Sequence, residues 1–377
     1  MDLARSALVI TPIAAALAGC SPSIHVEVLR PADISLPAQI QTLAVVDRSA
    51  PKNVGQAILG SLEGMVTGEG VLHDREAASQ CVNGLVWGLT ESPRFEVAIP
   101  NLANEDAESS IWARELSWPA ARRIARTVEA DALVTLDAFD SDSFMEVTTE
   151  VRETSDGVKK TVYNAERETR VLSAWRIYDV ENKVILDDIR DHTVTRTWRE
   201  EGSSRADAQA RLPRRGDTVV EMGRVAGEAY AMRIAPSYIW VTRQYYGKKY
   251  DELKEAKRYV KARDWQGATE IWLRAVESPD RKLRGMAAYD LALAMEVGGD
   301  LEGALQWSKK AAVDLANGRS RRYVSTLERR LWEQARLAEQ MAPPPPEEPP
   351  SPLGPNPARV EREQDEERDG VMTRPDR

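Results

Sequence analysis

The chain has few of the residues from which catalytic and metal sites are usually built. Its 377 residues include three histidines and two cysteines. The sequence contains neither the Gly-x-Ser-x-Gly elbow of serine hydrolases nor a glycine-rich phosphate loop. We therefore predict no catalytic, cofactor or metal site, and we expect that the protein is not an enzyme.

Long hydrophobic runs are also missing. After the first twenty residues, no apolar run approaches the roughly 20 residues that a membrane-spanning helix needs. The apolar content of 42% is still sufficient for ordinary cores, and the length predicts two folded domains plus tails. The net charge is −9. We expect no nucleic-acid partner, because affinity for nucleic acid comes mostly from neutralising its phosphates.

The first nineteen residues have the composition of an export signal. Arg5 precedes an apolar run, Ala7 to Leu17, that is too short to span a bilayer. The run ends in Leu17-Ala18-Gly19-Cys20, and Ser21 follows. This tetrad resembles the lipobox of bacterial lipoproteins, in which the cysteine thiol takes a diacylglyceryl group and becomes the mature amino terminus.

The resemblance implies a signal peptide over residues 1–19 and a lipidated Cys20. In proteobacterial lipoproteins a serine after the cysteine favours sorting to the outer membrane. We therefore expect Cys20 to anchor the chain there, with its folded part facing the periplasm, since several acyl chains anchor stably. Two alternatives stay open: an uncleaved amphipathic start, and an ordinary signal cut after the Ala14 to Ala16 run.

Cys81 is left without a disulfide partner if Cys20 is lipidated. It lies in a predicted helix from Asp74 to about Thr90, whose apolar residues recur at spacings of three and four. Cys81 belongs to this apolar stripe. We expect a packed structural thiol rather than a nucleophile.

An α/β or α+β mixed-sheet domain is predicted over residues 40–235, preceded by a lipidated start and a first strand within residues 20–39. Apolar and alternating segments predict the strands Ile24–Val28, Leu43–Asp47, Arg94–Ile99, Ala132–Leu136, Thr169–Tyr178 and Val184–Trp198. Helices are expected over Val54–Val66 and Asp74–Thr90, from Ser117 with Pro119, and from Asp217. On the last helix, Gly223 and Gly227 would permit close approach to the sheet. Helices between early strands, followed by an antiparallel pair, predict a layered mixed sheet.

Several of these segments are similar to successive landmarks of two envelope domains, the TolB amino-terminal domain and the curli-secretion lipoprotein domain. The landmarks are Leu43–Asp47, Leu89–Ile99 and Ala130–Val134, followed by a hairpin of Arg176–Asp179 and Lys183–Leu186. The resemblance covers about residues 40–235. It implies a module for assembly and interaction.

Residues 236–341 contain an internal repeat. Asp264-Trp265-Gln266-Gly267-Ala268 matches Asp300-Leu301-Glu302-Gly303-Ala304 after a shift of 36 residues. This resembles the tetratricopeptide repeat, whose period is close to 34, and predicts an all-α, tetratricopeptide-like domain after a junction at Pro236. A groove for a protein partner would then be lined near Tyr250, Leu253, Met286, Tyr289 and Leu293.

The remaining residues, 342–377, predict a disordered tail. Nine of the sixteen residues from Ala342 to Pro357 are proline, and a charged run from Glu361 to Asp369 follows. The lipobox, the mixed domain and the repeats together also resemble an uncharacterised family of tetratricopeptide lipoproteins. That resemblance implies no activity.

The segment Asp187-Asp188-Ile189-Arg190-Asp191-His192 has the densest set of potential metal ligands. Alternate residues of a strand share a face, so we expect Asp188, Arg190 and His192 to point the same way. The arginine between the other two favours an ion pair over a metal site.

The sequence thus predicts a lipid-anchored, periplasm-facing scaffold that binds envelope proteins through its tetratricopeptide-like and α/β surfaces. The alternative is a peptidoglycan- or glycan-binding lipoprotein, or a weak cell-wall hydrolase, that uses exposed tryptophans such as Trp112 or Trp198. Self-association into an oligomer within a secretion assembly is a third hypothesis.

Overall fold

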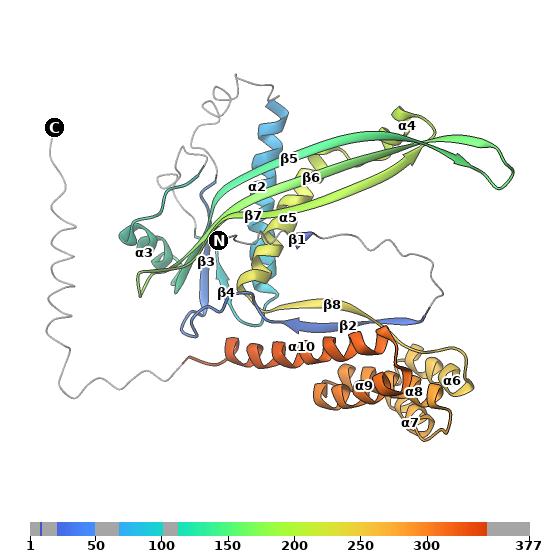
Figure 1. Cartoon of the computed structure of the whole chain (residues 1–377). Helices are drawn as coiled ribbons and strands as arrows, with labels where there is room; N and C mark the ends of the chain where they lie inside the picture. Colours follow the sequence, from blue (N-terminus) through green and yellow to red (C-terminus); the bar gives the residue numbers. More distant parts are fainter. Residues whose placement is uncertain (1–7, 10–20, 50–67, 101–111, 345–377) are drawn as a thin grey trace, which may run out of the picture. The chain divides into compact units, whose positions relative to one another are not determined.

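The structure is a computed structural model that describes residues 8–9, 21–49, 68–100 and 112–344. Its first part is a mixed sheet (Figure 1). The strand order is β1-β7-β6-β5-β3-β4. β3 pairs in parallel with β4 and β5, whereas β5, β6 and β7 pair antiparallel, and β1 joins β7 in parallel. The strands are β1 (Leu8–Val9), β3 (Thr42–Asp47), β4 (Glu96–Ala98), β5 (Ala132–Glu153), β6 (Lys159–Asp179) and β7 (Val184–Gly202). The predicted mixed sheet with an antiparallel side is confirmed.

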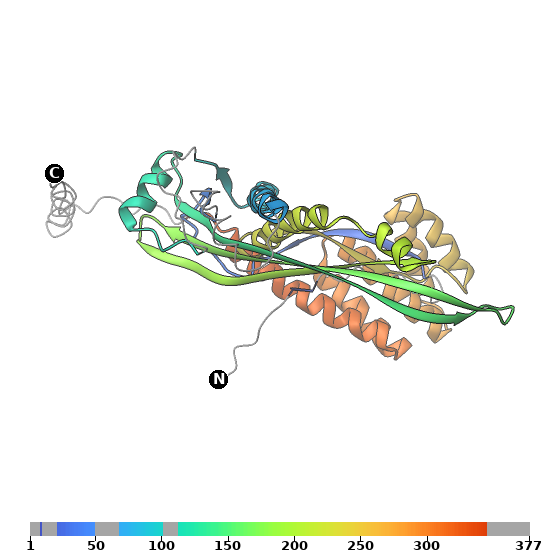
Figure 2. The ribbon, with the colours of Figure 1, turned by 90° about the horizontal axis from the view of Figure 1, so that it is seen from above.

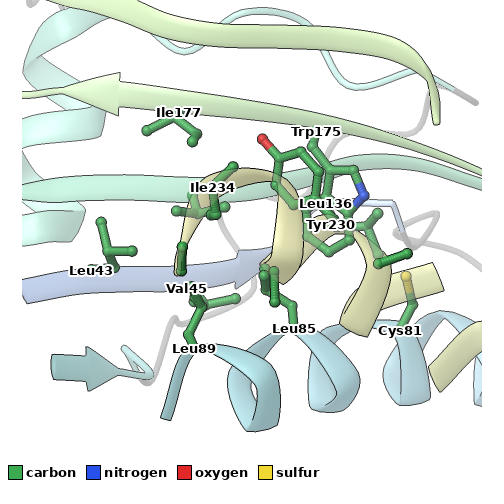
Figure 3. Packing of buried hydrophobic residues seen from close by; sticks show 14 of the residues in the cluster. Leu43, Val45, Cys81, Leu85, Leu89, Leu136, Trp175, Ile177, Tyr230 and Ile234 are labelled. Atoms are coloured by element: carbon green, nitrogen blue, oxygen red, sulfur yellow. The ribbon is translucent and has the colours of Figure 1, made fainter. Parts of the chain in front are cut away.

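Helices cover both faces of the sheet around β3. Leu43 and Val45 face one core, which contains residues of α2 (Gly68–Thr90) and α5 (Arg215–Ile234). Ala44 and Val46 face a second core with α3 (Trp118–Arg126). Successive side chains of a strand point to opposite faces. The four consecutive apolar residues of β3 therefore allow it to lie between two layers of helices. Figure 3 shows Val45 beside Leu89 of α2.

Glycines bring α2 and α5 together. Gly84 and Gly88 lie four residues apart on α2, as do Gly223 and Gly227 on α5, and a Cβ at Gly227 would overlap the carbonyl oxygen of Cys81. The expected close approach of Gly223 and Gly227 is therefore present, but it is to α2 and not to the sheet. Small residues at this spacing allow two helix backbones to pack in direct contact.

The predicted packing of Cys81 is confirmed. Its side chain is fully buried in the core that also contains Trp175 and Tyr230, whose stacked ring centroids are 4.7 Å apart (Figure 3). Burial raises the pKa of the Cys81 thiol well above its usual value. The reactive thiolate is disfavoured there.

β5 and β6 continue far beyond the predicted strands as a hairpin. β7 pairs with β6 only as far out as Tyr163, and Figure 2 shows the tip of the hairpin extending past β7. We call the outer part of this hairpin, Phe144 to Glu168, the arm. From Thr148 to Glu153 every residue of β5 is exposed, on both faces. The alternation that identifies a half-buried strand is missing there, which is why the sequence analysis did not find it.

A short helix packs on the base of the arm, in a segment for which no helix was predicted. This helix, α4 (Arg205–Arg211), begins at Ser204, whose side chain accepts a hydrogen bond from the Asp207 amide. Ala208 of α4 is fully buried against Val147 and Ala165 of the hairpin. The Ser-x-x-Asp spacing is a helix-start signal that the prediction overlooked.

A second, two-stranded sheet pairs the start of the described chain with its middle. β2 (Ser23–Arg30) and β8 (Ser237–Gln244) are antiparallel, with Ser23 opposite Gln244 and Arg30 opposite Ser237. The first strand was predicted, but its partner was taken for a domain junction after Pro236. The junction is thus a strand.

The chain after β8 is helical, so the predicted order of a mixed sheet followed by an all-helical region is confirmed. Asp264 and Asp300, the equivalent residues of the repeat, each cap a helix and accept a hydrogen bond from the amide of Gly267 or Gly303, at 2.9 and 2.8 Å. The helices are α6 (Asp251–Lys261), α7 (Trp265–Ala275), α8 (Arg281–Val297), α9 (Leu301–Leu315) and α10 (Gly318–Gln340).

Described residues up to Ala342 belong to one compact unit. At the end of α10, the Gln340 side chain accepts from the Ala32 amide at 2.9 Å and donates to its carbonyl at 3.1 Å. The Arg94 Nε donates to the Gln340 carbonyl at 2.9 Å. Three of the sequence predictions lie outside the described residues: the tetrad ending in Cys20, the helix Val54–Val66 and nearly all of the tail.

Replacing Gly227 by alanine should lower the free energy of unfolding by about 3 kcal/mol, because the new methyl group must push α5 away from α2. Urea denaturation of Gly227→Ala measures this. Gly298→Ala is the matched control: its Cβ would meet nothing closer than 3.4 Å, so a change below about 1 kcal/mol is expected. Equal effects of the two substitutions would contradict the helix contact.

Candidate binding surfaces

The five residues predicted to line a groove do lie in the helical region, but mostly in its interior. Leu253, Met286, Tyr289 and Leu293 are buried in the core shared by the helices. Tyr250 is half-buried and donates its hydroxyl proton to Asp280 at 2.7 Å. The proposed groove is therefore corrected: these residues hold the helices together, and four of them present almost no surface to a partner.

The segment from Asp187 to His192 does not place its polar side chains as expected. The pairing of β6 with β7 shifts between Ser173 and Trp175, so that Ala174 of β6 lies opposite two residues of β7, Arg190 and Asp191. This bulge reverses the alternation. His192 consequently shares a face with Asp187, toward α5, and not with Asp188 and Arg190.

On the outer side, the predicted ion pair is present: Arg190 lies 3.8 Å from Asp188. On the inner side, Asp187 accepts two hydrogen bonds from Arg233, at 3.0 and 2.9 Å, and one from the Tyr230 hydroxyl at 3.0 Å. The His192 ring packs edge-on against Tyr230. Among the described residues, no cluster of His, Cys, Asp or Glu side chains could hold a metal ion.

A buried ionic cluster lies where β3 ends, and β5 and β6 each contribute one residue to it. Asp137 accepts from Arg48 at 3.0 Å and from Arg176 at 2.6 Å, and Arg176 also donates to the Tyr178 hydroxyl. Burial raises the pKa of Asp137, while the two arginines oppose the shift. Since both carboxylate oxygens are occupied by guanidinium groups, the cluster is suited to holding strands in place rather than to proton transfer.

The tryptophans proposed for glycan binding differ in exposure. Trp112 is 45% exposed, whereas Trp198 is half-buried against the main core and has Arg196 over its ring. Among the described aromatic residues outside the arm, Trp240 of β8 is the most exposed, at 68%, and Tyr238 of the same strand is 53% exposed. Two residues apart on a strand, they share one face.

The arm exposes apolar side chains that a strand hairpin would normally bury. Phe144, Val151 and Val158 are each more than 60% exposed. Charged pairs surround them, including Arg152 between Glu150 and Glu201. Exposed apolar residues rimmed by charges are typical of surfaces that bind other proteins.

A pocket of about 400 Å³ lies between the β2–β8 ribbon and α10. We call it the arginine pocket, because its lining includes Arg30, Arg243, Arg329, Arg330 and Arg336. Val28, Ile239 and Val241 of the ribbon form an apolar wall, and Trp332, which is 59% exposed, lines the pocket from α10.

Hydrogen bonds to a buried carboxylate hold the floor of the arginine pocket. Glu296 is buried beneath it and accepts two hydrogen bonds from Arg243, both at 2.8 Å, and a third from the Tyr323 hydroxyl at 2.8 Å. Burial, and then the neighbouring Glu296 carboxylate, raise the pKa of Tyr323. Tyr323 therefore stays protonated and remains a donor to Glu296.

Only part of this pocket has a signal in the sequence. Arg329, Trp332 and Arg336 follow one another at spacings of three and four, which places them on one face of a helix, and this signal was available. The strands that complete the pocket come from residues 23–30 and 237–244. These two strands are more than 200 residues apart in the chain, so no local sequence pattern indicates that they pair.

Burial lowers the pKa of His192 to about 4, and the nearby Arg233 adds to this effect. An unfolded histidine keeps a pKa near 6.5. Between these values only the unfolded chain takes up the proton, so stability contributed by neutral His192 should be lost as the pH falls from about 6.5 to 4, by up to about 3 kcal/mol.

Denaturant unfolding of the wild type and of His192→Gln at pH 7.5 and 4.5 measures this difference. The variant should lose less stability on acidification than the wild type. Identical losses in the two proteins would show that His192 is not the group responsible.

Comparison with known families gives two matches along the chain. Residues 254–329, in the helical region, match the family described as Domain of unknown function (DUF6340). No curated protein matches the chain. Residues 40–246, more than half of the chain, match the family described as Domain of unknown function (DUF8603) and contain strands β3 to β7 of the mixed sheet, helices α2 to α5 and β8. The chain therefore belongs to the DUF8603 family.

Proposed function

We propose that this protein is a lipid-anchored component of the bacterial envelope that serves as a scaffold for other envelope proteins. The observation that carries the proposal is the tetrad Leu17-Ala18-Gly19-Cys20, placed three residues before β2 begins at Ser23. A lipobox cysteine becomes the mature amino terminus, so the acyl chains would be attached directly beside the folded unit. Among the described residues, no helix is long and apolar enough to cross a membrane.

The arm supports the scaffold role. Its strands continue beyond the helices that cover the rest of the sheet (Figure 1), and ordering them costs conformational entropy that their own burial does not offset. Phe144 and Val151 would gain stability by packing against another protein. Such a partner would be an envelope protein, or a second copy of this chain if the protein forms oligomers.

The helical region supports the same role, and we infer that it is tetratricopeptide-like. Equivalent residues of the two repeats occupy equivalent places. Ala268 and Ala304 are both fully buried, and Arg263 and Gly299 both end a helix with positive φ, 62° and 84°. Because the predicted groove is filled, a partner would bind to the outer surface of the helices.

A glycan-binding role remains the alternative, and Tyr238 with Trp240 favours it. Side by side on one face of β8, their rings could stack on sugars. Retention of the protein on purified peptidoglycan, together with its loss in Trp240→Ala, would support this alternative in place of the scaffold role.

Anchoring is tested by labelling cells with a radioactive fatty acid and separating inner from outer membranes. The wild type should carry label and fractionate with the outer membrane. Cys20→Ala should carry none and be released, because its tether is missing. Unlabelled wild-type protein in the soluble fraction would contradict the anchor.

The scaffold role is tested by cross-linking in cells that produce wild type, Phe144→Ser or Val313→Ser. Both residues are highly exposed, at 65% and 71%, but Val313 lies on α9, away from the arm. Phe144→Ser should lose a defined cross-linked species that wild type and Val313→Ser retain. Loss in neither variant, or equally in both, would count against binding through the arm.

A further inference from the structure

We propose that the arginine pocket binds the phosphate monoester group of an organic ligand. This inference goes beyond the scaffold role and requires neither the lipid anchor nor the arm. It rests on the charge of the pocket, on guanidinium groups whose hydrogen bonds are incomplete, and on the apolar wall beside them.

The charges in and beneath the pocket do not cancel. Five arginines line it, and three carboxylates contact them, namely Asp33, Glu296 and Glu333. The surplus is two positive charges. A phosphate monoester carries a charge of about −1.5 to −2 at pH 7, which matches this surplus more closely than the single charge of a carboxylate.

The arginines on α10 still have hydrogen-bonding capacity. Glu333 lies 3.6 Å from Arg329 and 3.8 Å from Arg330, whereas charge-assisted hydrogen bonds are typically about 2.7–2.9 Å long. Arg330 donates to the Leu29 carbonyl at 3.3 Å, and its buried Nε lies 3.9 Å from Glu296 without a hydrogen-bond partner among the described residues. The planar guanidinium groups match the oxygens of a phosphate.

The remaining surfaces of the pocket indicate that the phosphate is attached to an organic group. Ile239 and Val241 offer apolar contact on the ribbon side. Trp332 offers a ring face on the α10 side, with the Arg336 guanidinium 5.5 Å from its centre. Inorganic phosphate would leave these surfaces uncovered, whereas an organic phosphate would bury part of them.

The test is titration calorimetry of the full chain carrying Cys20→Ala, which removes the anchor proposed above, so that failure here and failure of the anchor remain distinguishable. Phenyl phosphate is the probe, and benzoate is the carboxylate comparison. Phenyl phosphate should bind more tightly than benzoate. Arg329→Gln combined with Arg336→Gln should weaken its binding by about tenfold or more, as expected for lost charge-assisted hydrogen bonds.

Arg321→Gln is the matched control, since Arg321 is an exposed arginine of α10 outside the pocket. It should leave the affinity for phenyl phosphate unchanged. Circular dichroism establishes that each variant is folded. The proposal is overturned if phenyl phosphate does not bind, if benzoate binds equally well, or if the control weakens binding as much as the double variant.

Vesicles distinguish the two sources of a phosphate monoester. If the natural ligand is a lipid headgroup, the same protein should be retained on vesicles containing phosphatidic acid, but not on phosphatidylcholine alone, and the double variant should not be retained. Binding of phenyl phosphate without retention on vesicles assigns a soluble organic phosphate to the pocket instead.

Discussion

The antiparallel pairing of β2 with β8 is the constraint on which the rest of the structure depends. β2 begins directly after the proposed anchor, and its side chains Ile24 and Val26 pack on the core of the helical region. The segment that follows β2 reaches the sheet domain, because the Ile34 amide donates to the Arg233 carbonyl of α5 at 3.0 Å, and reaches the end of α10 through Ala32. One strand therefore joins the helices to the sheet, directly after the proposed anchor.

This pairing also creates the arginine pocket. α10 alone would present Arg329 and Arg336 to water, where isolated surface charges bind anions weakly and are screened by salt. The ribbon adds an apolar wall, and Arg243 of β8 is fixed by the buried Glu296. The arm, in contrast, gains little stability from burial against the rest of the chain. It is a hairpin that buries little of its own surface, so its exposed Phe144 is better explained by a partner than by folding.

Much of the fold could be predicted from sequence, because local patterns encode it. The uninterrupted apolar run of β3, the stripe through Cys81 and the repeated Asp-x-x-Gly-Ala helix starts each carry their own signal. Three features could not be predicted this way. The β2–β8 pairing is non-local, the arm lacks alternation, and the bulge at Arg190 and Asp191 reverses the faces of β7. The groove prediction was wrong for a related reason: periodicity identifies buried positions, but it does not tell a packed interface from an open one.

Hydrogen exchange of the β2 amides tests the central claim most directly. If β2 is the strand that ties the unit together, the amides of Ser23–Arg30 that bond to β8 should exchange as slowly as those of Ser237–Gln244, since the two strands can open only together. β2 amides that exchange at the rate of an unfolded peptide, while α10 stays protected, would contradict the account. The helices would then hold together without β2.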